Sequence, residues 1–291
     1  MNRVTTRVRP LLATLVAACG LLLPACQPPP RAVKDASITP LAAQFDPKTT
    51  GTIRGQVTWT GKLPAIEPIR LLLKTEGLAT DPPNPNAPRI DPKTLGMDQT
   101  LVYLLKVAPE KSKPWSHADV EVAFEKSQLV IQQGERQGRL GVVRRGAEIA
   151  CVSREKRSHV LLGRGASVFS LSLIDMNAVT RRPLNDTGIV DLTSGTALFW
   201  LRGALWVGEH PYASVTDAAG AFEMRDVPPG TYEIVSWSPN WRIVGSERHP
   251  EFGEIERLLF APPVEQKTSV VVRSGETATV DFRWDESLFN K

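Results

Sequence analysis

Histidine and cysteine are the side chains of this sequence that could bind a transition metal. The sequence holds four histidines and three cysteines, and imidazole and thiolate are the ligands that zinc and copper favour. His159, His210 and His249 lie on separate segments, so they could form a metal site only if their loops converge. Cys151 lies inside an apolar alternation shortly before His159, which predicts a buried structural thiol.

Two pairs of acidic residues could suggest acid–base catalysis. They are Glu254 with Glu256, and Asp285 with Glu286. Neither pair accompanies a nucleophile or a cleft-forming motif. The sequence also has no G-x-S-x-G, no Walker glycine loop and no H-E-x-x-H. We therefore interpret the pairs as solvated turn residues and expect that the protein is not an enzyme.

The N-terminal segment is typical of a secretory signal. Arg3, Arg7 and Arg9 precede an apolar run that is too short and too interrupted for a membrane-spanning helix. We expect residues 1–25 to be a signal peptide. Its removal leaves 32 Lys and Arg against 31 Asp and Glu. A nearly neutral chain excludes nucleic acid as an expected partner, because phosphate binding needs clustered positive charge.

The apolar run ends in Leu23-Pro24-Ala25-Cys26, which resembles a lipobox. In such a motif, small residues before the cysteine admit the signal peptidase, and the thiol receives a diacylglycerol. Cys19 follows two alanines and is the alternative acceptor, but it would leave an apolar core of residues 11–18 only. We favour Cys26; an ordinary secretory signal with a coincidental cysteine is the other interpretation. After Cys26 only Cys151 remains, so no intrachain disulfide is available.

Residues 26–50 are rich in proline and lack periodicity, which is typical of a flexible tether between an anchor and a folded body. Gln27, rather than Asp, follows the cysteine. By resemblance to lipoprotein sorting, this residue indicates an outer-membrane anchor in the cell envelope.

From residue 51 onward, the pattern is of short alternating runs separated by Gly, Pro, Asn and Asp, without a sustained helical period. The expected strands are 52–59, 100–107, 120–124, 128–132, 148–153, 167–173, 188–191, 199–207, 213–217, 221–225, 230–236, 256–260, 268–272 and 276–284. Strands at this spacing predict an all-β sandwich or barrel.

Two stretches, 75–98 and 238–254, are expected to be irregular, and the first should lie over the sandwich as a loop. Five tryptophans sit in strand-like runs and are expected to be buried: Trp59, Trp200, Trp206, Trp237 and Trp284. Trp115 and Trp241 lie in loop contexts. They are the candidates for exposed platforms that contact a ligand.

The strongest local motif is the run 213–237, ASVTDAAGAFEMRDVPPGTYEIVSW. Its T-D-A-A-G segment predicts a hairpin turn whose glycine takes a positive φ, and V-P-P-G predicts a second turn. The run resembles the transthyretin-like, carboxypeptidase-regulatory-like β-sandwich. Residues 51–61 resemble the first strand of that family and 101–105 its second. The resemblance implies a folding, adhesion or carbohydrate-associated module without active-site chemistry.

The middle of the chain resembles a cupredoxin. Residues 140–162 are similar to the segment that carries the first copper ligand of that family, and His159 stands at the ligand's place. Residues 195–212 resemble cupredoxin-type modules fused to transthyretin-like ends in electron-transfer and methylamine-utilisation proteins. In that comparison, His210-Pro211-Tyr212 is a turn that links the two modules.

The remaining copper ligands of the cupredoxin pattern are replaced. When the shared tryptophan is aligned on Trp200, Gly195 stands at the place of the cysteine, Leu198 at that of the second histidine and Leu201 at that of the methionine. A blue-copper site needs a thiolate and two imidazoles, which one histidine cannot supply. The resemblance therefore implies a cupredoxin fold whose site is filled with apolar packing.

The predicted architecture is an all-β chain with a transthyretin-like sandwich built from residues 51–108 and 208–286. A cupredoxin-like Greek-key module, 109–207, is inserted between them; the alternative is two sandwiches in tandem. We expect a non-enzymatic cell-envelope lipoprotein without a cofactor, which presents its surfaces to an envelope protein or a glycan. One alternative is a periplasmic copper protein that uses His159 for electron transfer or copper handling. Another is a carbohydrate-binding accessory domain that uses Trp115 or Trp241.

Overall fold

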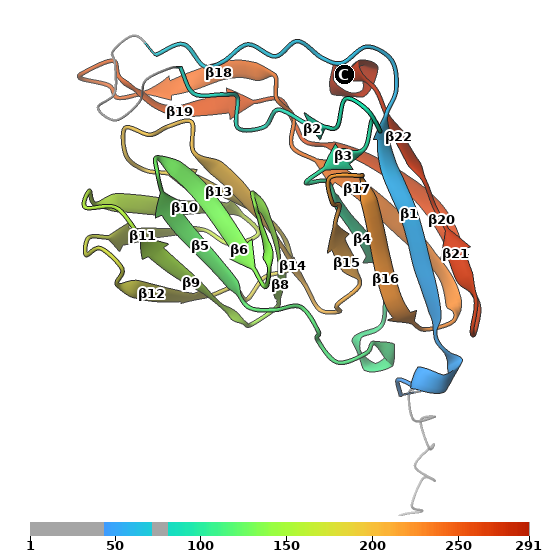
Figure 1. The fold of residues 1–291 in the computed structure, drawn as a ribbon. Coiled ribbons are helices and arrows are strands. Elements are labelled where there is room, and N and C mark those ends of the chain that lie inside the picture. The colour runs from blue at the N-terminus through green and yellow to red at the C-terminus, as the bar shows by residue number, and fades with distance from the viewer. Residues whose placement is uncertain (1–43, 72–80, 291) are drawn as a thin grey trace, which may run out of the picture. The chain divides into compact units, whose positions relative to one another are not determined.

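The computed structural model describes residues 44–71 and 81–290, and strands dominate it (Figure 1). The all-β prediction is confirmed. The expected signal peptide, both candidate lipid acceptors, Cys19 and Cys26, and residues 26–43 of the expected tether lie outside the described residues. The end of the expected tether contains the 3-10 turn η1 (Pro47–Thr49), which Asp46 caps by accepting a hydrogen bond from the backbone N–H of Lys48.

Two sheets form a first sandwich, which we call the host sandwich. Its strands are β1 (Gly51–Trp59), β4 (Leu101–Leu105), β15 (Ala213–Val215), β16 (Ala221–Val227), β17 (Gly230–Ser238), β20 (Val264–Val272), β21 (Thr277–Thr279) and β22 (Phe282–Trp284). One sheet has the order β16-β1-β21, with β22 also paired to β1, and the other has the order β15-β4-β17-β20. Strands from both ends of the described chain therefore share one apolar core.

Strand β1 shows how the sequence sets this arrangement. Ile53, Val57 and Trp59 alternate with more exposed residues and point into the core. Gly55 stands at a close approach, because a Cβ atom there would lie 1.6 Å from the carbonyl oxygen of Val280. Gly220 has a φ of 74°, as predicted for the turn before β16.

Two further sheets form a second sandwich, the inserted sandwich. Its strands are β5 (Val120–Glu125), β6 (Gln128–Gln133), β7 (Arg136–Gly138), β8 (Leu140–Arg144), β9 (Glu148–Ser153), β10 (His159–Gly165), β11 (Phe169–Leu173), β12 (Val179–Pro183), β13 (Gly188–Ser194) and β14 (Arg202–Gly208). The sheet orders are β12-β9-β5-β6-β7 and β11-β10-β13-β14-β8. All ten strands lie in sequence between β4 and β15, which pair with each other in the host sandwich.

The host and inserted sandwiches pack together through strands that are buried on both faces. In β4, Val102 and Leu104 face the host core, while Leu101 and Tyr103 face the inserted sandwich. The buried residues of this contact are Leu101, Tyr103, Leu140, Val142, Ala204, Trp206, Ala213, Val235 and Trp237. All of them belong to one compact unit of the chain.

The expected irregular stretches contain short paired strands. The first includes β2 (Arg89–Ile90) and β3 (Met97–Asp98), and two asparagines fix it. Asn84 and Asn86 are buried and donate to the carbonyl oxygens of Trp241 and Asn240, each at 2.8 Å. The second stretch was expected to be irregular throughout, but it contains β18 (Ile243–Arg248). That strand pairs with β19 (Ile255–Phe260) rather than burying one face, which explains the missing alternation.

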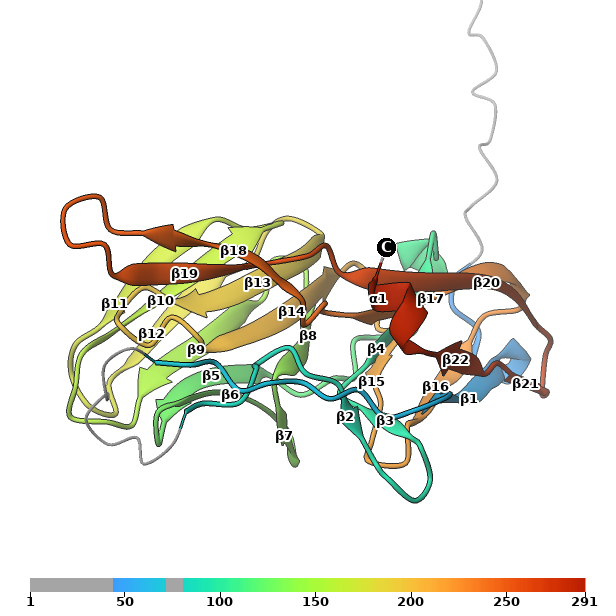
Figure 2. The same cartoon turned by 90° about the horizontal axis from the view of Figure 1, so that it is seen from above.

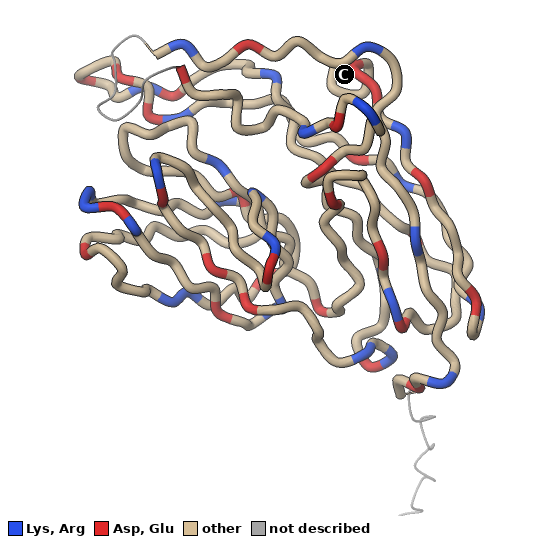
Figure 3. The backbone as a smooth tube through the Cα atoms, viewed as in Figure 1, with Lys and Arg blue, Asp and Glu red and all other residues tan. Residues whose placement is uncertain are grey.

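The β18–β19 hairpin lies along the inserted sandwich (Figure 2), and Leu258 joins the apolar core of that sandwich. The described residues also contain the 3-10 turn η2 (Pro109–Lys111) and a short helix α1 (Glu286–Phe289). No helix in the described part of the chain is long and apolar enough to span a membrane. Figure 3 shows basic and acidic residues mixed along the described backbone.

Candidate functional site

Leu198 and Leu201, which the sequence resemblance places at copper-ligand positions, form an apolar plug. Leu198 and Leu201 lie on the connection between β13 and β14, and both are buried in the core together with Trp200. The N–H of Gly195 donates to the carbonyl oxygen of Val160 at 2.8 Å, so this connection lies beside the start of β10. None of these side chains carries a donor atom for copper. The set does not fit a blue-copper centre.

His159 opens β10 and is 1% exposed. Its ring stacks on that of Phe124, and its Nε2 lies 3.0 Å from a carboxylate oxygen of Glu155. Burial is the main cause that lowers the pKa of His159, against the opposing effect of Glu155. Within the described part of the chain, Nδ1 has no hydrogen-bond partner. The imidazole is thus a neutral core group held between an aromatic ring and a carboxylate.

The other histidines do not join His159. His210 is buried between the rings of Trp206 and Tyr212, and His249 stacks on Phe252 in the turn of the β18–β19 hairpin. Across residues 44–71 and 81–290, no three His, Cys, Asp or Glu residues are placed to hold a metal ion.

Cys151 lies on β9 and is fully buried, as predicted. Burial, followed by the charge of Glu121, raises the pKa of the Cys151 thiol to about 12. A thiol in this state is a poor nucleophile and a poor metal ligand at neutral pH.

The two candidate tryptophan platforms differ. Trp241 is 9% exposed, so the expectation that it is an exposed platform is wrong. Its ring packs on Phe289 at a centroid distance of 3.9 Å and on Trp59 at 6.0 Å. Trp115 is half-buried and meets the ring of His117 edge-on at 5.3 Å. The five tryptophans expected in the core are buried.

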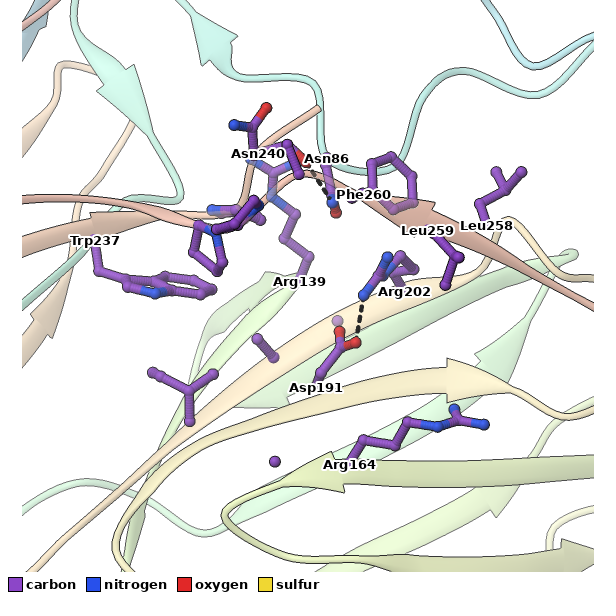
Figure 4. A pocket seen from close by; sticks show the side chains of 18 of the residues that line it. Asn86, Arg139, Arg164, Asp191, Arg202, Trp237, Asn240, Leu258, Leu259 and Phe260 are labelled. Atoms are coloured by element: carbon purple, nitrogen blue, oxygen red, sulfur yellow. Dashed lines mark hydrogen bonds and ion pairs between the residues drawn. The ribbon is translucent and has the colours of Figure 1, made fainter. Parts of the chain in front are cut away.

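A cavity of about 450 Å³ lies at the meeting of the two sandwiches and the β18–β19 hairpin (Figure 4). We call it the arginine pocket, after the four arginines among its lining residues, Arg139, Arg164, Arg202 and Arg257. Among the described residues that line it, Asp191 is the only acidic one. The apolar wall includes Ile189, Trp237, Leu258, Leu259, Phe260, Pro262 and Pro263. The size and mixed lining are typical of a site for a small organic molecule.

The four guanidinium groups are held in different ways. Arg202 forms an ion pair with Asp191 and lies over the ring of Phe260, 4.6 Å from its centroid. Arg257 pairs with Glu247 at 3.5 Å.

Arg164 and Arg139 have neutral partners instead. Arg164 donates to the hydroxyl of Thr193 at 2.9 Å. Arg139 is 6% exposed and donates to the carbonyl oxygens of Pro85 and Ala87, at 2.6 and 2.8 Å. Burial lowers the pKa of Arg139 to about 9. Neither of these arginines has a carboxylate hydrogen-bond partner in the described part of the chain.

Sequence reasoning missed the arginine pocket. Its arginines come from the residue before β8 and from β10, β14 and β19, so no local spacing connects them. The available signal was weak. Arg164 lies within β10 and Arg202 begins β14, and the neighbouring residues of both are apolar or small. A charged side chain in such a run is seldom buried without a partner.

Comparisons with known proteins give the chain no family. No family model matches it, and no curated protein matches it. Among solved structures, amicyanin from Paracoccus versutus matches with 15% identity and a TM-score of 0.25, over 34% of this chain and 96% of that one. A purple cupredoxin from Nitrosopumilus maritimus matches with 10% identity and a TM-score of 0.24, over 31% of this chain and 99% of that one.

Proposed function

We propose that this protein is a non-enzymatic lipoprotein of the cell envelope, and that its two sandwiches serve as a binding module without a blue-copper centre. The observation that carries the proposal is the apolar plug of Leu198 and Leu201 at the ligand positions that the resemblance implies, together with the buried, neutral His159. The resemblance of residues 213–237 to transthyretin-like modules, which lack active-site chemistry, supports the same function. Cys26 is the proposed lipid acceptor, with Gln27 directing the anchor to the outer membrane.

Lipidation is tested by labelling cells that produce the full chain with a tritiated fatty acid and by detergent phase partitioning. The native chain and Cys19→Ala should incorporate label and enter the detergent phase, whereas Cys26→Ala should do neither. Label retained in Cys26→Ala and lost in Cys19→Ala would move the anchor to Cys19. Absence of label in the native chain would overturn the lipoprotein proposal.

Copper is tested separately on the purified protein loaded with Cu(I) or Cu(II), desalted and assayed for retained metal and visible absorption. The proposal expects no stoichiometric copper. One copper that is retained by the native protein and lost from His159→Phe would establish the copper-handling alternative. The phenylalanine keeps the stack on Phe124, so loss of metal from this variant would not result from a collapsed core.

A glycan is a candidate ligand of this binding module. Trp115 lines an open cavity of about 660 Å³ together with polar residues such as Gln44, Lys113 and Glu209. A half-exposed indole beside hydrogen-bonding groups is suited to stack on a sugar ring. Trp115→Ala should abolish binding on a glycan array, and Trp115→Phe should retain part of it. An array without any bound glycan would remove this candidate.

A further inference from the structure

The arginine pocket contains more positive charge than its surroundings neutralise. Four guanidinium groups and one carboxylate line it, and that carboxylate, Asp191, is already paired with Arg202. Arg257 is bridged to Glu247, which does not line the pocket. The charges of Arg139 and Arg164 have only neutral hydrogen-bond acceptors among the described residues.

Arg139 is the least compensated of these groups. Its side chain is almost fully buried, and its Nε has no hydrogen-bond partner within the described part of the chain. The Nε of Arg202 is buried without a partner as well. A buried charge or donor without a partner destabilises the folded state, because it has lost its hydrogen bonds to water and forms none with the protein. Arg89 and Asp98 act on the charge of Arg139 in opposite directions, so they do not replace a direct partner.

The lining of the pocket suits a ligand that has an anionic group and an apolar body. Figure 4 shows Arg202 beside Asp191, with Arg164 on the other side of Asp191 and Arg139 extending towards Asn86 and Asn240; Leu258, Leu259 and Phe260 lie beyond Arg202. Guanidinium groups match the oxygens of phosphate and carboxylate through paired N–H donors. The leucine and phenylalanine side chains match an apolar or planar body.

We propose that the arginine pocket binds a small organic oxyanion, a phosphate or carboxylate carried on an apolar body. Arg164 and Arg139 contact its oxygens, and the β19 wall covers its body. Because the lining comes from the host sandwich, the inserted sandwich and the β18–β19 hairpin, the bound anion joins all three parts. This site is separate from Trp115 and from the cupredoxin ligand positions, so it does not depend on the proposed absence of copper.

The test is isothermal titration of the full-length protein with phenyl phosphate, benzoate and inorganic phosphate, at an ionic strength held constant with sodium chloride. Phenyl phosphate or benzoate should bind at one site per chain, and the stronger of the two identifies the head group. Inorganic phosphate should bind at least about tenfold more weakly, because it lacks the body that the apolar wall covers.

Two pocket variants and one matched control decide where the anion binds. Arg164→Gln and Arg139→Gln, which remove the two side chains proposed to contact the oxygens, should each weaken the binding of the best probe at least about tenfold. Arg181→Gln removes the same charge from exposed β12 and should bind as the native protein does. Circular dichroism and the melting temperature establish that each variant is folded, and the anion should raise the melting temperature of the native protein and of Arg181→Gln only. Absence of saturable binding by the native protein, or equal binding by Arg164→Gln and Arg181→Gln, would overturn the proposal.

Discussion

The imidazole of His159 stacks on the phenyl ring of Phe124, with ring centroids 4.2 Å apart and ring planes 9° apart. His159, for which the sequence resemblance implies a copper ligand's place, therefore packs as an aromatic core residue with one polar contact, to Glu155. Its contribution to stability can be measured independently of any metal.

His159→Ala should lower the free energy of unfolding by about 2–4 kcal/mol, because it removes a buried ring and leaves a cavity. His159→Phe keeps the stack and loses only the contact between Nε2 and Glu155, so it should cost about 1 kcal/mol. Urea denaturation followed by tryptophan fluorescence compares the two variants with the native protein. An equal loss in both would show that the Glu155 contact, and not the stack, carries the contribution.

His210 makes the protein less stable in acid. Burial is the main cause that lowers the pKa of His210 to about 4, from the ordinary value of 6.5 expected in the unfolded chain. The unfolded state therefore binds a proton more readily between these two values. The contribution of the neutral His210 to the free energy of unfolding is fully present above pH 6.5. It is lost as the pH decreases to about 4, and the loss is on the order of 3 kcal/mol at most.

The matched variant for this pH dependence is His210→Asn. The Nδ1 of His210 accepts a hydrogen bond from the backbone N–H of Tyr212 at 3.3 Å, and an asparagine oxygen can take over that role. The variant should show a shallower loss of stability below pH 6.5. Burial also lowers the pKa values of His117 and His159, so part of the slope should remain. Identical slopes in the variant and the native protein would contradict the assignment to His210.

Cys151 should be unreactive in the folded protein. Its thiol is fully buried and its pKa is raised to about 12, so almost no thiolate forms at pH 8. In a chain with Cys19→Ser and Cys26→Ser, Ellman's reagent should titrate no thiol under native conditions and one thiol in guanidinium chloride. Rapid reaction of the folded protein would mean that β9 opens readily to solvent.

Gly55→Ala should destabilise the protein by about 3 kcal/mol or more, because the added methyl group collides with the backbone oxygen of Val280. Gly245→Ala is the matched control on β18. Its Cβ would lie 3.6 Å from Leu259, which is an ordinary contact, so the change should stay within about 1 kcal/mol. Thermal unfolding of both variants provides the measurement. Similar melting temperatures would show that the β1 pairing is looser than the structure indicates.

The sequence predicted many of the strands that bury one face, but it missed β8 and β10, although β10 alternates, and it also missed strands that bury no residue. Runs such as 52–59 and 230–236 alternate strongly, and the structure has strands there. Strands β12 and β18 have no fully buried residue, so their pairing depends on a neighbouring strand and leaves little periodic signal.

Burial of the loop residue Trp241 and formation of the arginine pocket are tertiary effects. Trp241 is covered by Phe289 from helix α1, which lies far along the chain and which no pattern near residue 241 indicates. His159 could be singled out from the sequence as a candidate metal ligand because the residues around it resemble a cupredoxin segment. The pocket arginines had no such pattern, and only the packing of β10, β14 and β19 brings them together.

The pairing of β1 with β21 and β22 sets the order in which this protein can be completed. Strands β5 to β14 are contiguous in sequence, so the inserted sandwich has all of its strands once residue 208 has been synthesised. The sheet around β1 must wait for residues 277–284. On a ribosome, all strands of the inserted sandwich are therefore available before the host sandwich can be completed. A nascent chain that stops just short of residue 277 holds those strands and Leu258 of their core, but it lacks the strands β21 and β22 that pair with β1.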